Sequence, residues 1–204
     1  MAITYPINLP SAPGFVSLKW SPRSAVAEQE SPFTYHNKVY VWDGQQRLIV
    51  VKLPPMSLAM AKEWQAWALK LNGIEGTFYL RDSVGAALRG AATGTGLVKG
   101  AGQLGATLNT DGWAKSVTGL FKAGDWIQLG TRLYSVLEMV NSDGAGNASL
   151  TLWPKIRTSP ADNYVIPYGT AAKGVFRLTG FPEFAWEVSR LMEGFEFTAK
   201  EEVS

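Results

Sequence analysis

A single stretch of this chain has the apolar periodicity of a helix, and the other apolar segments have to be accounted for as strands. The stretch runs from about residue 57 to residue 71, with Ser57 as the expected N-cap. Its large apolar residues fall four, three and four positions apart, which places them along one helix face. We expect this face to pack against a sheet through four residues: Met60, Trp64, Trp67 and Leu71.

The remaining apolar segments have the composition and alternation of β-strands. Residues 37–53 are rich in β-branched and aromatic residues on both sides of Asp43-Gly44, so we predict a hairpin that turns at this pair. Residues 184–188 and 195–199 alternate apolar with polar side chains, the period of half-buried strands. The first thirty residues contain four prolines and are expected to be extended or irregular. The predicted fold class is mainly β with one α-helix.

The composition changes in the middle of the chain. Residues 84–106 are rich in Gly and Ala, which suits a loop or linker, and strong β patterns return near residue 172. We therefore predict a split β-sandwich or barrel domain, made of residues 1–83 and 172–204, that carries the helix. Residues 84–171 would form an inserted, small, OB-like β-barrel domain, since insertion is tolerated where the ends of a loop lie close together.

Charge and composition argue against several classes of protein. The formal net charge is +2 without a run of Lys or Arg, so we expect no sequence-specific nucleic-acid binding. The absence of cysteine removes disulfides and thiolate metal sites. No run of 18 apolar residues predicts a membrane span, and MAITYPINLP lacks the basic and apolar regions of a signal peptide. We expect a soluble protein made in a cytoplasm.

The residue patterns of a catalytic site are also missing. His36 is the only histidine, so it has no histidine partner for a metal, and no cysteine could use it as a base. The segment GAGQLG, residues 100–105, matches a dinucleotide-binding glycine pattern, with Asp125 twenty residues after its last glycine. Asp111-Gly112 would break the helix that this motif requires, so we expect a loop. The chain is predicted to be no enzyme and to have no cofactor and no metal.

Tryptophans in the expected insertion leave two interpretations open. They could pack inside the module, or they could form a flat aromatic surface that contacts a ligand such as a sugar. The candidates for such peripheral contact are Trp113, Trp126 and Trp153.

The order of the segments resembles the distal tail protein of long-tailed, siphovirus-type bacteriophages. The resemblance rests on an extended start, ITYPINLP, followed by SPFTYHNKVYVWDGQQRLIVVKLPPM, a Trp-bearing helix that leads into LNGIEGTFYLRD, and a closing KGVFRLTG. It covers nearly the whole chain, most firmly residues 30–82 and 120–180. Its motifs are patterns of Trp, Gly and Pro rather than a chemical signature.

The resemblance implies a structural function at the tip of a viral tail. Members of that family form a homohexameric ring that joins the tail tube to the tail hub or baseplate and lets DNA pass. The expected partners are therefore other copies of the chain, the tail tube protein and the tail hub protein, and they extend to tape-measure or receptor-binding proteins. The expected location is the virion tail tip, after assembly in the host cytoplasm. An alternative is a carbohydrate-binding or other peripheral tail-tip module that contacts the host surface.

A ring needs apolar surface beyond what one copy can bury. The apolar faces of the 37–53 hairpin and of the closing strands are the strongest candidates, because they are more than a thin two-layer domain needs. The predicted ring interface consists of seven residues: Val39, Val41, Phe184, Trp186, Val188, Phe195 and Phe197.

Overall fold

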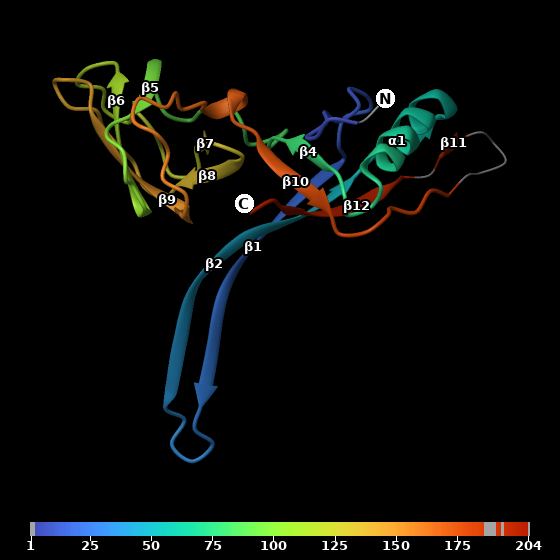
Figure 1. Ribbon diagram of the computed structural model, residues 1–204, viewed down its shortest axis with the longest axis horizontal. Coiled ribbons are helices and arrows are strands. Elements are labelled where there is room, and N and C mark those ends of the chain that lie inside the picture. Colours follow the sequence, from blue (N-terminus) through green and yellow to red (C-terminus); the bar gives the residue numbers. More distant parts are fainter. Residues whose placement is uncertain (1–2, 186–190, 193, 204) are drawn as a thin grey trace.

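The computed structural model describes residues 3–185, 191–192 and 194–203 and is mainly β, with one α-helix in the described part. It contains two five-stranded sheets, one of which is a half-barrel. The first sheet joins strands from both ends of the chain in the order β1 (Ser17–Glu30), β2 (Asn37–Lys52), β12 (Glu196–Glu201), β10 (Gly174–Leu178) and β4 (Thr77–Leu80). The two sheets lie side by side, and the β1–β2 hairpin extends far away from both (Figure 1).

The second sheet comes from the middle of the chain. Its order is β5 (Gly94–Val98), β6 (Gly105–Trp113), β9 (Ala148–Ile156), β8 (Arg132–Val136) and β7 (Trp126–Leu129). Residues 164–168 bridge to both outer strands, through Val165 to Leu97 of β5 and through Tyr168 to Ile127 of β7. A 3₁₀ turn, Gly169–Ala171, then leads back to β10 of the first sheet.

Helix α1 (Leu58–Leu71) covers one side of the first sheet. Ser57 precedes it with extended backbone but makes no side-chain capping bond, and Asn72 ends it in the left-handed conformation at φ 49°. The prediction placed Met60 on the packed face, but this side chain is 38% exposed. The buried face keeps the other three predicted residues and is turned slightly towards two alanines, whose small side chains let the helix approach the sheet. Its members are Ala61, Trp64, Trp67, Ala68 and Leu71.

The first core contains a cluster of aromatic rings beneath the helix. The indole of Trp64 lies 6.1 Å from the Phe197 ring and 5.8 Å from the Phe195 ring, measured between centroids. Phe195 and Phe197 are only 2% and 3% exposed, so their prediction as ring-interface residues is wrong. The reason is that the chain's own helix covers the apolar face of β12.

The other predicted interface residues at this end of the chain have different outcomes. Phe184 is half-buried and stacks on Phe195, with 4.9 Å between ring centroids. Trp186 and Val188 lie outside the described residues. A short two-stranded sheet, β3 (Met56–Ser57) with β11 (Leu191–Met192), lies beside the start of the helix.

The hairpin does not turn at Asp43-Gly44, so that prediction is wrong. Strand β2 runs straight through this pair, and the chain reverses at residues 31–36 instead. Ser24 pairs with Gln45 and Val26 with Val41, so Asp43 and Gly44 lie in a bulge of β2. Glycine is needed there because a Cβ on Gly44 would lie 2.6 Å from the Cβ of Ala25.

Two segments expected to be irregular are strands. β1 pairs with β2 along most of its length and tolerates Pro22 because it is an edge strand of the sheet. Within the 84–106 segment, β5 forms and β6 begins. GAGQLG is a loop, as predicted, with φ of 87° at Gly100 and 78° at Gly102, and it leads into strand β6 rather than a helix.

The loop between β8 and β9 contains a carboxylate whose titration can be tested. Asp143 accepts backbone N–H bonds from Ala145 and Asn147, both at 2.8 Å, and a side-chain bond from Asn147 Nδ2 at 2.7 Å. The Asn147 side chain, helped by these backbone donors, lowers the pKa of Asp143 from 3.8 to about 2. A lowered pKa stabilises the folded loop above pH 3.8, and this contribution is lost as the pH falls through 2.

We expect a carbon-detected NMR titration to give a pKa near 2 for Asp143. The Asn147→Ala variant should raise this pKa towards 3.8, because it removes the largest cause of the shift. A pKa of 3.8 in the unaltered chain would contradict the loop geometry.

Candidate assembly arm and its anchoring charges

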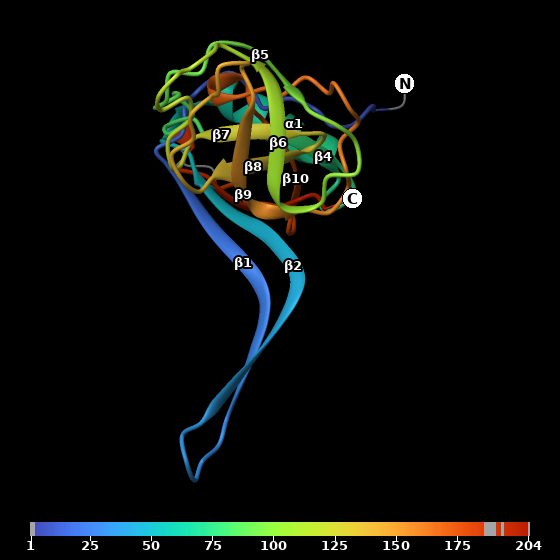
Figure 2. The same ribbon diagram turned by 90° about the vertical axis from the view of Figure 1, so that its left-hand side faces the viewer.

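The most unusual feature of the structure is the outer part of the β1–β2 hairpin. We call residues 25–44, beyond the Ser24–Gln45 pair, the arm. In two perpendicular views the arm extends away from both sheets and from the helix (Figures 1 and 2). Nearly every residue of the arm is exposed. A two-stranded ribbon is only marginally stable alone in water, so this arm needs support from something else.

Both faces of the arm carry apolar side chains. Val39 and Val41 alternate along β2 and lie on the same face as Val26, which pairs with Val41. The opposite face carries Tyr40 and Trp42, stacked with 6.4 Å between ring centroids. Val41 is 68% exposed and Trp42 is 57% exposed. An exposed apolar surface of this kind marks an interaction site.

The tip of the arm is apolar as well. Residues 31–36 form the reversing loop, in which Phe33 is 90% exposed and Tyr35 is 77% exposed with φ of 55°. His36, the only histidine, is exposed in the same loop, and its carbonyl accepts from the Ser31 N–H. The arm therefore presents large rings at its end as well as along its length.

The base of the arm is tied to the second sheet. Lys155 Nζ lies 2.9 Å from Asp43 Oδ1, and this hydrogen bond lowers the pKa of the Asp43 carboxyl. Arg157 Nε donates to the Asp43 carbonyl at 3.1 Å. The backbone N–H of Lys155 donates to Gln45 Oε1 at 2.6 Å. These contacts fix the direction in which the arm leaves the body, although exposed ion pairs add little stability.

A buried charge cluster lies just inside this base. Glu201 is fully buried, and its carboxylate accepts from Arg47 Nη1 at 3.3 Å and from Arg132 Nη2 at 3.2 Å. The backbone N–H of Leu133 donates to the same carboxylate at 3.2 Å. Arg47 and Glu201 come from neighbouring strands of the first sheet, whereas Arg132 and Leu133 belong to the second. The cluster therefore joins the two sheets.

Arg47 is enclosed between two indole rings. Its guanidinium carbon lies 4.9 Å from the Trp126 ring centroid and 4.6 Å from that of Trp153. Its Nη1 donates to the Leu133 carbonyl at 2.5 Å and its Nη2 to the Trp153 carbonyl at 3.0 Å. Burial, only partly offset by Glu201, lowers the pKa of Arg47 to about 10.

The three tryptophans proposed for peripheral contact do not form a common outer surface. Trp126 and Trp153 are half-buried at the junction of the sheets, where they hold Arg47. Trp113 is buried in the second core, and its N–H donates to Thr110 Oγ1 at 2.7 Å. Its ring packs closely against the backbone of Gly96, since a Cβ there would lie 2.0 Å from it. The prediction of peripheral contact is wrong for Trp113 and gains no support for the other two.

Asp125, which follows the glycine pattern of residues 100–105, has a structural role as an acceptor of backbone hydrogen bonds. This carboxylate, 2% exposed, accepts backbone N–H bonds from Arg89 at 2.8 Å, Gly90 at 3.0 Å and Lys122 at 2.8 Å. Asp125 thus holds two loops together. Among residues 3–185, 191–192 and 194–203, no cluster of three or more potential metal ligands occurs. Within the same ranges, no helix is long and apolar enough to cross a membrane.

Sequence reasoning missed the charge cluster, although the pattern contained a signal. Arg47 continues the period-two series of buried residues formed by Ile49 and Val51. Glu201 continues the series formed by Phe197 and Ala199. Charged residues in line with a buried face are rarely unpaired. Arg132 likewise continues the series formed by Tyr134 and Val136.

Comparison with known proteins assigns this chain to no family. No protein-family model and no curated protein sequence matches this chain.

Proposed function

We propose that this protein is a structural subunit that assembles with copies of itself, as a ring-forming component of a phage tail tip. The observation that carries the proposal is the arm, which exposes apolar side chains on both faces and at its tip. An isolated apolar ribbon lowers the solubility of the protein and has no hydrophobic core to stabilise it. Its conformation is therefore explained best by contact with a partner surface.

The sheet edges support association in one direction. β1 is an outer strand of the first sheet, and beyond β4, at the opposite edge, Ile7 pairs with Phe78. The Ile7 N–H donates to the Thr77 carbonyl at 3.0 Å, and the Tyr79 N–H donates to the Ile7 carbonyl at 2.9 Å. Of the two edges of the first sheet, the β1 edge is therefore the one without a further paired segment among the described residues. An arm that meets a different surface on the next copy makes a heterologous contact, which closes into a ring when the rotation fits.

The arrangement of the two sheets fits the same role. In this proposal, residues 1–83 and 172–204 form the ring domain, and residues 84–171 form an OB-like module on its periphery. The expected assembly is a hexamer that contacts the tail tube and hub proteins and surrounds the path of DNA at the virion tail tip. The proposed role is therefore structural rather than catalytic.

Light scattering after size-exclusion chromatography tests the proposal. The unaltered protein should form a ring-sized oligomer at high micromolar concentration. The double substitution Val39→Asp with Val41→Asp should weaken association at least about tenfold, since burying two unpaired carboxylates in an apolar contact costs more than the roughly 1.4 kcal/mol that a factor of ten represents.

Glu30→Gln is the matched control, because it changes the charge of the same strand face of the arm without altering an apolar side chain. It should leave the oligomer intact. A strictly monomeric unaltered protein, or a double variant that assembles normally, would count against the arm as the contact.

A further inference from the structure

The first sheet has one covered face and one face that is open to solvent. Ile49, Phe197 and Ala199 point to the covered face, where they belong to the first core. Because side chains alternate along a strand, the residues between them point to the other side of the sheet, which we call the outer face. Leu48 and Val50 lie there and are only half-buried. The outer face therefore keeps part of its apolar surface in contact with solvent.

Basic side chains surround this apolar centre. The strand register places Lys19 of β1 beside Val50 and Lys200 of β12 beside Leu48. Lys52 follows Val50 by two positions on β2, so it shares the same face, and all three lysines are exposed. Within the described ranges, none of the three forms an ion pair.

The outer face has an excess of positive charge. On β12 and on the parts of β1 and β2 inside the arm, it carries four basic residues, the three lysines and Arg23. Its one carboxylate on these strands is Glu196, which lies opposite Lys52 in register. Just beyond β12, Glu202 is already engaged with Arg177 at 2.8 Å. Four positive charges against one negative charge suit a partner surface that is acidic.

One face of the arm has the complementary character. The face that carries Val26, Val39 and Val41, which we call the valine face, also carries two carboxylates. Glu28 lies opposite Val39 in register, and Glu30 follows Glu28 by two positions on β1, so both share this face. The valine face therefore combines an apolar stripe with negative charge, as the outer face combines an apolar centre with positive charge.

The opposite face of the arm is less suited to this partner. Lys38 lies there, with its Nζ 5.2 Å from the Tyr40 ring centroid. A positive charge on that face would meet the lysines of the outer face, and like charges oppose association.

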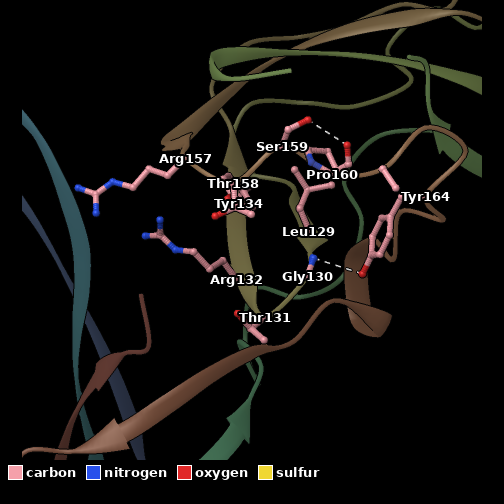
Figure 3. Close-up of a pocket in the computed structure, with 11 residues that line it drawn as sticks. Leu129, Gly130, Thr131, Arg132, Tyr134, Arg157, Thr158, Ser159, Pro160 and Tyr164 are labelled. Atoms are coloured by element: carbon pink, nitrogen blue, oxygen red, sulfur yellow. Dashed lines mark hydrogen bonds between the residues drawn. The ribbon is translucent and has the colours of Figure 1, made fainter. Parts of the chain in front are cut away.

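A cavity of about 530 Å³ near the base of the arm does not offer the same combination. Figure 3 shows that the guanidinium groups of Arg132 and Arg157 point away from the side where Pro160 and Tyr164 lie. Its charged and apolar groups are thus separated, whereas the valine face presents both together.

We propose that the valine face of one copy's arm packs on the outer face of the first sheet in the next copy. The valines would lie against Leu48 and Val50, and the two carboxylates would lie among the lysines. Two β-sheets pack face to face about 10 Å apart, and both surfaces here are sheet faces. This inference rests on the assembly proposed above and names the surface that the arm meets. The contact is heterologous, because the arm and the outer face are different surfaces of the chain.

The charged contacts lie at the edge of the apolar contact. An exposed ion pair contributes little, so the loss of a single charge, as in Glu30→Gln, is tolerated. Reversing several charges brings like charges together and should not be tolerated.

Charge reversal on the outer face is the first test, with light scattering as the measurement. Lys19→Glu with Lys200→Glu should weaken association at least about tenfold, because the new carboxylates face those of the arm. Adding Glu28→Lys with Glu30→Lys should restore association to within about threefold of the unaltered protein, since the charges are then exchanged. The matched control is Lys115→Glu with Lys122→Glu, which makes the same charge change at exposed positions between β6 and β7 and should have no effect.

The second test uses the absence of cysteine, which makes engineered thiols the only ones in the protein. A chain with Val39→Cys is mixed with a chain that carries Ser21→Cys, an exposed position opposite Leu48 on the outer face. A bismaleimide reagent should join the two chains through these positions, as read by mass spectrometry. Ser149→Cys, at an exposed position of β9, replaces Ser21→Cys as the control and should give little product.

The outcomes separate this contact from the ring itself. An oligomer that forms normally but cross-links equally at positions 21 and 149, or that ignores the reversed lysines, would overturn the outer face as the acceptor and leave the ring proposal standing. A monomeric unaltered protein would overturn both. If Lys19→Glu with Lys200→Glu left the oligomer intact but abolished binding of a DNA duplex, the outer face would belong to a polyanion rather than to the arm.

Discussion

Replacing Glu201 with glutamine is expected to lower the free energy of unfolding by about 3–5 kcal/mol, the usual cost of breaking a buried ion pair from one side. Glu201 is fully buried and is the only carboxylate bonded to Arg47 and Arg132 in the described structure. Glutamine keeps most of the shape but leaves both guanidinium groups buried without a counter-charge. Urea unfolding followed by circular dichroism measures the change.

The neighbouring residue provides the control. Glu202 pairs with Arg177 at 2.8 Å, with both side chains about one-third exposed, so Glu202→Gln should cost about 1 kcal/mol or less. Adding Arg47→Met to Glu201→Gln should cost less than the sum of the two single changes, because the two groups are coupled. If Glu201→Gln and Glu202→Gln lowered the free energy of unfolding by the same small amount, the charge cluster would not help to hold the two sheets together.

The second large effect is expected at Trp64. Its side chain is fully buried, its N–H donates to the Ala12 carbonyl at 2.9 Å, and its ring packs against Trp67 at 5.3 Å between centroids. Trp64→Ala removes one of the two indole rings buried in the first core and leaves a cavity, so we expect a loss of about 3–5 kcal/mol. Thermal or urea unfolding measures this loss.

Leu69→Ala is the matched control on the same helix. Leu69 is 63% exposed, and alanine has the better helix propensity, so its effect should lie within about 0.5 kcal/mol. A negligible loss in Trp64→Ala would place that face of the helix in solvent and would contradict the packing described here.

Local patterns predicted the helix and the strand near residues 195–199, because each depends on neighbouring residues. The four-three-four spacing identified the helix, and its end at Asn72-Gly73 follows from the ease with which these residues adopt left-handed backbone. The error at Met60 is a small rotation of the packed face towards Ala61 and Ala68, which the large side chains alone could not resolve. The two buried alanines define the packed face, and alanine has no strong preference for inside or outside.

The error at Asp43-Gly44 has a physical cause that is also visible at Asp111-Gly112. Such pairs favour turns locally, yet Asp43-Gly44 and Asp111-Gly112 both lie within strands. At Gly112, φ is 77° and a Cβ would lie 2.3 Å from the Thr95 carbonyl oxygen. Here glycine permits the close approach of a neighbouring strand rather than a reversal of the chain. Which of the two occurs depends on a partner strand distant in sequence.

The sequence by itself determined which residues have the spacing of a buried face, because alternation and helical spacing are properties of the local chain. Only the tertiary structure decided what covers them. The apolar face of β12 is covered by the chain's own helix through Phe195 and Phe197, whereas Val39 and Val41 on β2 are covered by nothing within the described residues. Both sets have the same alternating pattern, since hydrophobic attraction has no direction and does not specify whether the partner is the same chain or another copy.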